Sequence, residues 1–243
     1  MKHKDFLIQF FCWALLVLVI ISPAVLSAKN IHGSGNQATI KGNYTDFDEV
    51  EISHSFDARV NYGKEYGIII RVDDNLKDYV VVEKKGNTLQ IGMKNGHSYI
   101  NSHLEVSVTL PDIRKLGLSG ASSVVINGFV FGHDLDVNLS GASKVYGAFE
   151  TGNLDLSLSG ASDVTLKGKG ENLVIRASGS STVKMDDFRV NDAKLQLSGS
   201  SNCMVNIDGE MDVQASGSSK VKYCGKGELG SIEASGFSKV KRM

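Results

Sequence analysis

Residues 118–122 read Leu118-Ser119-Gly120-Ala121-Ser122, and a closely related pentapeptide recurs six more times along the chain. The later copies span residues 139–143, 158–162, 177–181, 197–201, 215–219 and 234–238. Their central glycines are Gly120, Gly141, Gly160, Gly179, Gly199, Gly217 and Gly236, which lie 21, 19, 19, 20, 18 and 19 residues apart. A repeat of this length predicts a solenoid.

Each repeat contains two short runs in which apolar and polar residues alternate, one before the glycine and one after it. Residues 154–158 and 164–166 are an example. Alternation with a period of two is typical of β-strands, and the repeats contain no stretch with helical spacing. We therefore predict an all-β protein built around a parallel β-helix, a solenoid with coils of about 19–20 residues.

Aligning the repeats on their glycines identifies the residues that face the interior. The residues four positions before the glycine are Leu116, Val137, Leu156, Ile175, Leu195, Val213 and Ile232, and those four positions after it are Val124, Val145, Val164, Val183, Cys203, Val221 and Val240. Both columns are apolar, so we expect them to fill the interior. Each large apolar side chain buried there contributes about 1.5–3 kcal/mol.

The Ser-Gly-small-Ser corner has a structural explanation. Glycine is needed where φ is positive or where neighbouring coils approach too closely for a Cβ atom. Serines flank all seven glycines, and we expect them to form hydrogen bonds along the stack or back to the turn. A phosphate-binding glycine loop would need a helix after the glycine, which the sequence does not predict. We therefore expect no catalytic, cofactor-binding or metal-binding residue in the corners.

The first residues predict export. Lys2 and Lys4 precede an apolar run over residues 6–21, and small residues follow up to Ala28. This pattern is typical of a secretory signal peptide, here residues 1–27, with cleavage after Ser27 or Ala28. The apolar run is shorter than the roughly 20 residues that span a bilayer. We expect a protein of the periplasm or the cell surface, with no transmembrane segment after cleavage.

Residues 28–112 lack the repeat but keep strand signals, with alternating runs near residues 50–62, 68–72, 89–93 and 104–110. We predict a less regular β region that packs on or continues the first coil and covers its end, followed by the regular β-helix over residues 113–243. Residues 74–79 are expected to form one helical turn. Lys239, Lys241 and Arg242 place charge on the last strand, which favours a monomer; end-to-end association is the alternative.

The net charge bears on the class of partner to expect. Without the leader the formal net charge is −2, because Lys2, Lys4 and Asp5 are lost from a chain whose formal net charge is −1. This balance gives no electrostatic case for nucleic acid or for an anionic membrane. Cys203, in an inward column, and Cys224 are expected to be free thiols. The histidines show no metal-ligand spacing.

An enzymatic function would need a cluster of carboxylates on the outer face. The nearest candidate is Asp136 and Asp155, in adjacent coils about 5 Å apart, with Asp134 and Asp163 nearby. A solvated polar face produces the same pattern, and we favour that interpretation. A binding role would instead use exposed aromatic residues, for which Tyr146, Phe149 and Phe237 are candidates.

Several short motifs occur in a characteristic order. They are Gly33-Ser34-Gly35-Asn36, Phe47-Asp48, Ser55-Phe56-Asp57-Ala58, Asn87-Thr88-Leu89, Val108-Thr109-Leu110-Pro111 and the Ser-Gly-Ala-Ser repeats. In this order they resemble the bacterial family called putative auto-transporter adhesin, head GIN domain. The resemblance implies a right-handed β-helix, export by Gram-negative bacteria and a role in cell adhesion.

The sequence as a whole favours a non-enzymatic, adhesin-like module that binds a glycan or a protein at the cell envelope. The alternatives are a polysaccharide lyase or hydrolase of pectin-lyase-like architecture, and a periplasmic structural or signalling protein.

Overall fold

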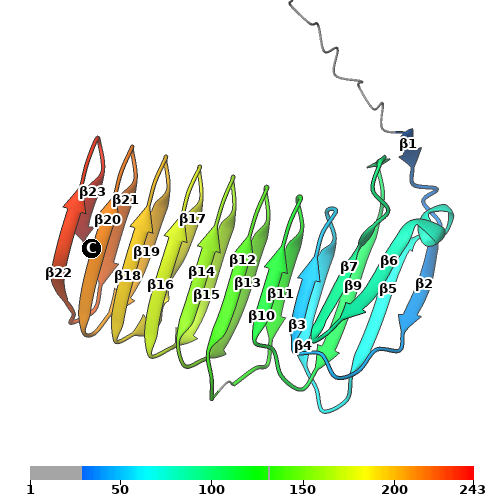
Figure 1. Cartoon of the computed structure of the whole chain (residues 1–243), viewed down its shortest axis with the longest axis horizontal. Helices are drawn as coiled ribbons and strands as arrows, with labels where there is room; N and C mark the ends of the chain where they lie inside the picture. The colour runs from blue at the N-terminus through cyan, green and yellow to red at the C-terminus, as the bar shows by residue number, and fades with distance from the viewer. Residues whose placement is uncertain (1–28, 131) are drawn as a thin grey trace, which may run out of the picture.

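The computed structural model describes residues 29–130 and 132–243 and is almost entirely β (Figure 1). The predicted signal peptide, residues 1–27, lies outside the described residues. Two long sheets run side by side along the molecule, one of ten strands and one of eleven. The stacked parallel strands form a β-solenoid, as the repeat predicts.

Each repeat contributes one strand to each sheet. The strands before the glycines belong to the ten-stranded sheet and are β10 (Lys115–Leu118), β12 (Leu135–Leu139), β14 (Leu154–Leu158), β16 (Asn172–Ala177), β18 (Asp192–Leu197), β20 (Glu210–Ala215) and β22 (Glu228–Ala234). The strands after the glycines belong to the eleven-stranded sheet and are β11 (Ser123–Asn127), β13 (Lys144–Glu150), β15 (Asp163–Lys169), β17 (Thr182–Val190), β19 (Asn202–Ile207), β21 (Lys220–Cys224) and β23 (Lys239–Arg242). All neighbours in these two series pair in parallel.

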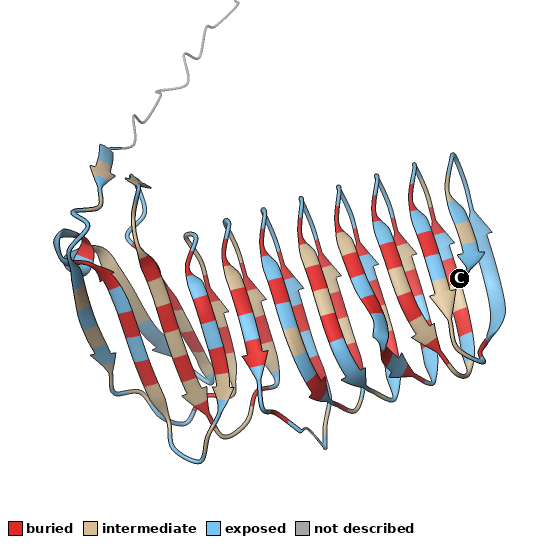
Figure 2. Ribbon diagram, turned by 180° about the vertical axis from the view of Figure 1, so that it is seen from behind, coloured by how far each residue is buried: buried red, intermediate tan, exposed pale blue. Residues whose placement is uncertain are grey.

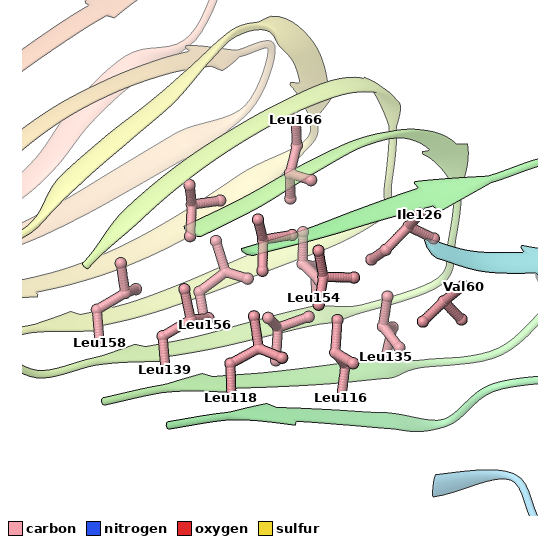
Figure 3. Packing of buried hydrophobic residues seen from close by; sticks show 14 of the residues in the cluster. Val60, Leu116, Leu118, Ile126, Leu135, Leu139, Leu154, Leu156, Leu158 and Leu166 are labelled. Atoms are coloured by element: carbon pink, nitrogen blue, oxygen red, sulfur yellow. The ribbon is translucent and has the colours of Figure 1, made fainter. Parts of the chain in front are cut away.

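The two predicted apolar columns form the core. Strand register places Leu116 beside Val137 and Val137 beside Leu156, so residues of one column lie directly above one another. Members of both columns are at most 1 % exposed in every coil except the last, where Ile232 is 37 % exposed. In Figure 2 buried positions alternate with less buried ones along each strand, and in Figure 3 the leucines of successive coils stack on one another.

The corners confirm the roles expected of glycine and serine. The corner glycines have φ between 67° and 76°, and a Cβ atom at Gly160 would collide with the carbonyl oxygen of Gly141. The Ala161 N–H donates to that same carbonyl oxygen at 2.8 Å. The hydroxyl of Ser162, which is fully buried, donates back to the carbonyl of Ser159 at 2.9 Å.

The N-terminal region continues both sheets but in a different strand order. β3 (Glu49–Ile52) lies between β10 and β7 (Thr88–Met93), and β4 (Asp57–Tyr62) lies between β11 and β9 (Leu104–Leu110). The coil formed by β3 and β4 is therefore enclosed by strands that come later in the chain. Residue 113 marks the start of regular coils, while both sheets extend across it.

Antiparallel strands extend both sheets at the first end of the solenoid. β5 (Gly67–Asp73) pairs antiparallel with β9, β2 (Gln37–Gly42) pairs antiparallel with β5, and β6 (Val80–Lys85) pairs antiparallel with β7. Residues 74–79 form the predicted helical turn, a 3-10 helix that places Leu76 fully inside.

The Gly33-Ser34-Gly35-Asn36 motif has a structural role at this end. The buried carboxylate of Asp73 accepts hydrogen bonds from the N–H groups of Gly35, at 2.8 Å, and His103, at 2.7 Å. β1 (Lys29–His32) pairs in parallel with β8 (His97–Ile100). The stretch 95–102, which connects β7 to β9, therefore contains a short strand.

Candidate functional site

Polar side chains form regular rows on the outer face of the ten-stranded sheet, next to the corners. One row contains Asn138, Ser157, Arg176 and Gln196, and the other contains the first corner serines Ser119, Ser140, Ser159, Ser178 and Ser198. Because the strands are parallel and in register, each row repeats every ~4.8 Å. The face thus presents the same hydrogen-bonding groups at a constant spacing.

A groove of about 1270 Å³ follows these two rows from β6 to β18. On β10 the first row has no side chain, because Gly117 lies at the position that Asn138 occupies in the next coil. At the N-terminal end it is bounded by Glu83 and Lys85 of β6, by Lys94 and Asn95 of the turn after β7, and by His97 at the start of β8.

The wall at this end is tied to the neighbouring coil. His54 occupies the corner between β3 and β4, with a φ of 65° where the regular repeats have glycine. Its Nδ1 lies 2.8 Å from the hydroxyl oxygen of Ser53, and its Nε2 lies 3.2 Å from Oδ1 of Asn95. These contacts hold the turn after β7 beside the groove.

Most charges along the groove are paired. Arg176 donates two hydrogen bonds to the carboxylate of Asp155, at 2.8 and 2.7 Å. Glu51 accepts a hydrogen bond from Gln90 at 2.8 Å and lies 3.6 Å from the ammonium of Lys115. The two rows therefore offer mainly neutral amides and hydroxyls, which suit hydrogen bonding to hydroxyl or peptide groups of an extended ligand, while apolar residues of β6 and β7 also line the groove.

Of the carboxylates that the sequence analysis considers for an enzyme, Asp136 and Asp155 lie side by side. Asp136 and Asp155 are neighbours in register, and partial desolvation together with the charge of Asp155 raises the pKa of Asp136. Neither residue lines the groove. Asp134 instead accepts a hydrogen bond from the Asn153 N–H at 2.8 Å, which lowers its pKa.

The expectation that Asp163 lies near this pair is wrong. It lies on β15 in the eleven-stranded sheet, beside Lys144, because it follows its corner while Asp136 and Asp155 precede theirs. Over residues 29–130 and 132–243, no group of three or more His, Cys, Asp or Glu residues is arranged to hold a metal ion.

Two of the three candidate aromatic residues are exposed. Tyr146 is 42 % exposed and Phe237 82 % exposed, whereas Phe149 is only 4 % exposed and packs on Phe188 with ring centroids 5.7 Å apart. The prediction for Phe149 is wrong because the ring turns inward, into the space beside the missing side chain of Gly147.

The two cysteines of the described chain are free thiols in different surroundings. Cys203 lies in the inward column, as expected, where burial raises its pKa to about 12. Cys224 is half-buried, and partial desolvation also raises its pKa. Neither thiol has the lowered pKa that a nucleophilic cysteine requires.

Sequence reasoning missed the residues that bound the groove. His54, Lys94, Asn95 and His97 come together only because β3 pairs with β7, and no local pattern signals that pairing. The ion pair between Arg176 and Asp155 was accessible from the sequence, since these residues are diagonal neighbours in adjacent coils.

Comparison with known proteins gives a family and a fold. No curated protein matches the chain. A putative adhesin from Bacteroides fragilis is similar in structure, with a TM-score of 0.81 and 19 % identity over 88 % of this chain and 100 % of that one. A putative adhesin from Parabacteroides merdae has a TM-score of 0.69 and 17 % identity over 89 % and 100 % of the two chains.

A putative lipid binding protein from Parabacteroides distasonis has a TM-score of 0.68 and 23 % identity, over 88 % of this chain and 100 % of that chain. At these identities the likeness shows a shared fold. Among the described residues no helix is long and apolar enough to cross a membrane. Residues 46–227 match the model of a single family, so the chain belongs to the family described as putative auto-transporter adhesin, head GIN domain.

Proposed function

We propose that the protein is a non-enzymatic, adhesin-like binding module that is exported to the cell envelope and holds an extended glycan or polypeptide in the groove. The observation that carries this proposal is the groove itself, about 1270 Å³ in volume and lined by polar side chains in regular rows. A repeating lining matches a ligand that is itself a repeating chain.

The chemistry of the lining favours an uncharged polar ligand. Asn138, Ser157 and Gln196 are neutral, and the charge of Arg176 is offset by Asp155. Each hydrogen bond contributes about 1 kcal/mol, so useful affinity requires several coils to act together. The lining contains no Phe, Tyr or Trp residue, and we therefore expect modest affinity for a short ligand and higher affinity for a long or multivalent one.

Membership of the adhesin family and the similar fold of the Bacteroides fragilis protein support this proposal. The Parabacteroides distasonis protein is described as lipid binding. The polar rows of the present groove favour a glycan or a polypeptide over an acyl chain.

The alternative of a polysaccharide-active enzyme has less support. Asp136 and Asp155 lie outside the groove lining, and Asp155 is occupied by Arg176. A general acid needs a raised pKa beside the scissile bond, and the raised pKa of Asp136 is not accompanied by a cleft around it.

The test is a binding screen of the mature chain, residues 28–243, against a glycan array and whole bacterial cells, with and without calcium. We expect saturable binding without product release. The groove variant Asn138→Ala/Arg176→Ala should lose at least about tenfold in affinity, since it removes hydrogen bonds worth about 1 kcal/mol each.

The control variant is Asn127→Ala/Arg189→Ala, which removes the same residue types from the eleven-stranded sheet. Arg189 also pairs with an aspartate, Asp208, at 3.6 Å, so both variants break one exposed ion pair. Equal ligand affinities of the two variants would refute the proposal that the groove is the binding site. Shortened or unsaturated sugar products that disappear in Asp136→Asn/Asp155→Asn would establish the enzyme instead.

A further inference from the structure

Five lysines gather on the outer face of the eleven-stranded sheet near its C-terminal end. We call them the basic face: Lys184, Lys220, Lys222, Lys239 and Lys241, all of them exposed. Strand register places Lys220 beside Lys239 and Lys222 beside Lys241. Met204 lies between Lys184 and Lys222, so the second row runs across four adjacent strands.

The basic face is not neutralised by its surroundings. Across the part of the chain that the structure describes, none of the five lysines forms an ion pair. The intervening positions are the uncharged Thr182, Asn202 and Met204. Like charges on adjacent strands destabilise a sheet. Here Lys220 lies beside Lys239 and Lys222 beside Lys241, on strands about 5 Å apart.

Acidic residues border this face without entering it. Asp163 lies one strand beyond Thr182. Asp186 and Asp187 lie where the register of β17 shifts, and Asp187 pairs with Lys167 at 2.9 Å. The positive charge of the basic face is therefore left for an external partner.

The opposite side of the same coils is acidic. The outer face of the ten-stranded sheet carries Asp192, Glu210, Asp212, Glu228 and Glu233, with Glu210 beside Glu228. Lys194 is the one lysine on strands β18, β20 and β22 of this sheet, and it lies next to Asp212. The C-terminal coils thus have opposite charges on opposite sides, and a negatively charged plane would orient the molecule with the basic face toward it.

An exposed aromatic residue lies beside the basic face. Phe237 is 82 % exposed and occupies the last described corner, two residues before Lys239, where the preceding corner has Ser218. An aromatic ring next to lysines is typical of protein surfaces that contact the headgroup region of a bilayer.

We propose that the basic face binds the surface of an anionic lipid membrane, with the ring of Phe237 inserted among the headgroups. Charge complementarity favours this partner, because each lysine near such a surface increases binding by roughly fivefold. The groove is on the other sheet and stays accessible when the basic face is bound. The inference therefore goes beyond the groove and does not depend on its ligand.

The test is co-sedimentation of the mature chain with vesicles of phosphatidylglycerol mixed with phosphatidylcholine, and with vesicles of phosphatidylcholine alone. We expect binding to the anionic vesicles only, and a steep loss as sodium chloride is raised. The variant Lys220→Gln/Lys222→Gln/Lys239→Gln/Lys241→Gln should lose about a hundredfold or more in partitioning. Phe237→Ser introduces the residue found in the preceding corner. Its partitioning onto vesicles should fall by a smaller factor, and this factor should be the same at low and high salt.

The matched control is Lys41→Gln/Lys64→Gln/Lys77→Gln/Lys84→Gln, which makes the same change in net charge at exposed lysines of the N-terminal region. It should bind vesicles nearly as the parent does, and the melting temperatures of all variants verify that they are folded. The groove variant Asn138→Ala/Arg176→Ala should also keep vesicle binding, which separates the two proposals.

Equal losses in the two lysine variants would overturn the proposal, since only net charge would then matter. It would also be overturned by binding to a soluble anionic polysaccharide, or by salt-sensitive dimers, in the absence of vesicle binding. Those results would assign the basic face to an acidic glycan or to the acidic face of a second copy.

Discussion

The regular repeats and the N-terminal region build the same two sheets by different routes. From the second repeat onward each coil stacks on the coil that precedes it in the chain, and each corner glycine lies over the preceding corner glycine. In the N-terminal region the coil of β3 and β4 is enclosed between β7 and β9 on one side and β10 and β11 on the other. Its corner residue is His54, and the next corner is the long excursion that contains β8.

This difference shows what the corner glycine is for. His54 tolerates a φ of 65°, so positive φ alone does not require glycine at a corner. In the repeats a Cβ atom would also collide with the carbonyl oxygen of the preceding corner glycine, as at Gly160. At Gly120, which packs on the N-terminal coil, the nearest atom would be the backbone nitrogen of His54 at 3.2 Å. Close stacking of identical corners imposes the repeat of glycine.

The largest expected effect tests this explanation. Gly160 and Gly120 share a φ of 75°, so valine at either position suffers the same backbone strain. Gly160→Val should lower the free energy of unfolding by about 4 kcal/mol or more, because the collision adds to the strain. Gly120→Val should cost about 2–3 kcal/mol. Urea denaturation followed by circular dichroism measures both values.

Asp163→Asn, in the same repeat as Gly160, should change stability by less than about 0.5 kcal/mol. If Gly160→Val does not fold, the alanine variants at the two glycines provide the comparison. Equal losses at Gly120 and Gly160 would mean that backbone conformation alone selects glycine.

The two ends of the solenoid provide the second comparison. Leu76 lies fully buried under the strands that cover the first end, while Ile232 of β22 is 37 % exposed. Leu76→Ala should cost about 2–5 kcal/mol, and Ile232→Ala about 1 kcal/mol or less, since part of the isoleucine already contacts water. Thermal unfolding of both variants checks the difference. A cost at Ile232 as large as that at Leu76 would show that the second end is covered in solution.

The smallest effect concerns charge. Where the two regions meet, Lys115 lies between Glu49 and Glu51, at 4.0 and 3.6 Å, but within the repeats strict register places Asp136 beside Asp155. Desolvation and the charge of Asp155 raise the pKa of Asp136. A carboxyl group with a raised pKa favours folding while it is protonated, and this contribution is lost as pH rises through the folded-state pKa.

Asp136→Asn should therefore be as stable as the parent at pH 7 or more stable by up to about 0.5 kcal/mol, and should show no gain at about pH 3. Melting temperatures across this pH range measure the change. Asp163→Asn serves as the control, because its neighbours in register are Lys144 and Thr182, whereas Asp136 lies between Lys115 and the carboxylate of Asp155. A loss of stability at neutral pH in Asp136→Asn alone would mean that the carboxylate has a favourable partner.

Errors of sequence reasoning came from contacts between distant segments and from one side-chain direction. Asp163 was expected near Asp136, although the corner between a repeat's two strands sends them to different sheets. Phe149 was expected outside, although it shares the parity of Val145 and fills the space beside Gly147. The inward columns, by contrast, were correct because strand alternation is a local property that register preserves through the stack.

Local sequence patterns are sufficient to predict the solenoid, its inward columns and its Ser-Gly-small-Ser corners. The physical reason is that a coil repeats one local pattern, and each copy can bury its apolar positions only against the next copy. The patterns also predict that something covers the first end of the stack.

Contacts between distant segments set the strand order of the N-terminal region, the groove and the distribution of charge. Pairing of β3 with β7 joins segments about forty residues apart, and no periodic signal encodes it. A net charge of −1 over the whole chain conceals a basic face and an acidic face on opposite sides of the same coils. Composition sums the charges, whereas folding places them, and electrostatic recognition depends on their placement.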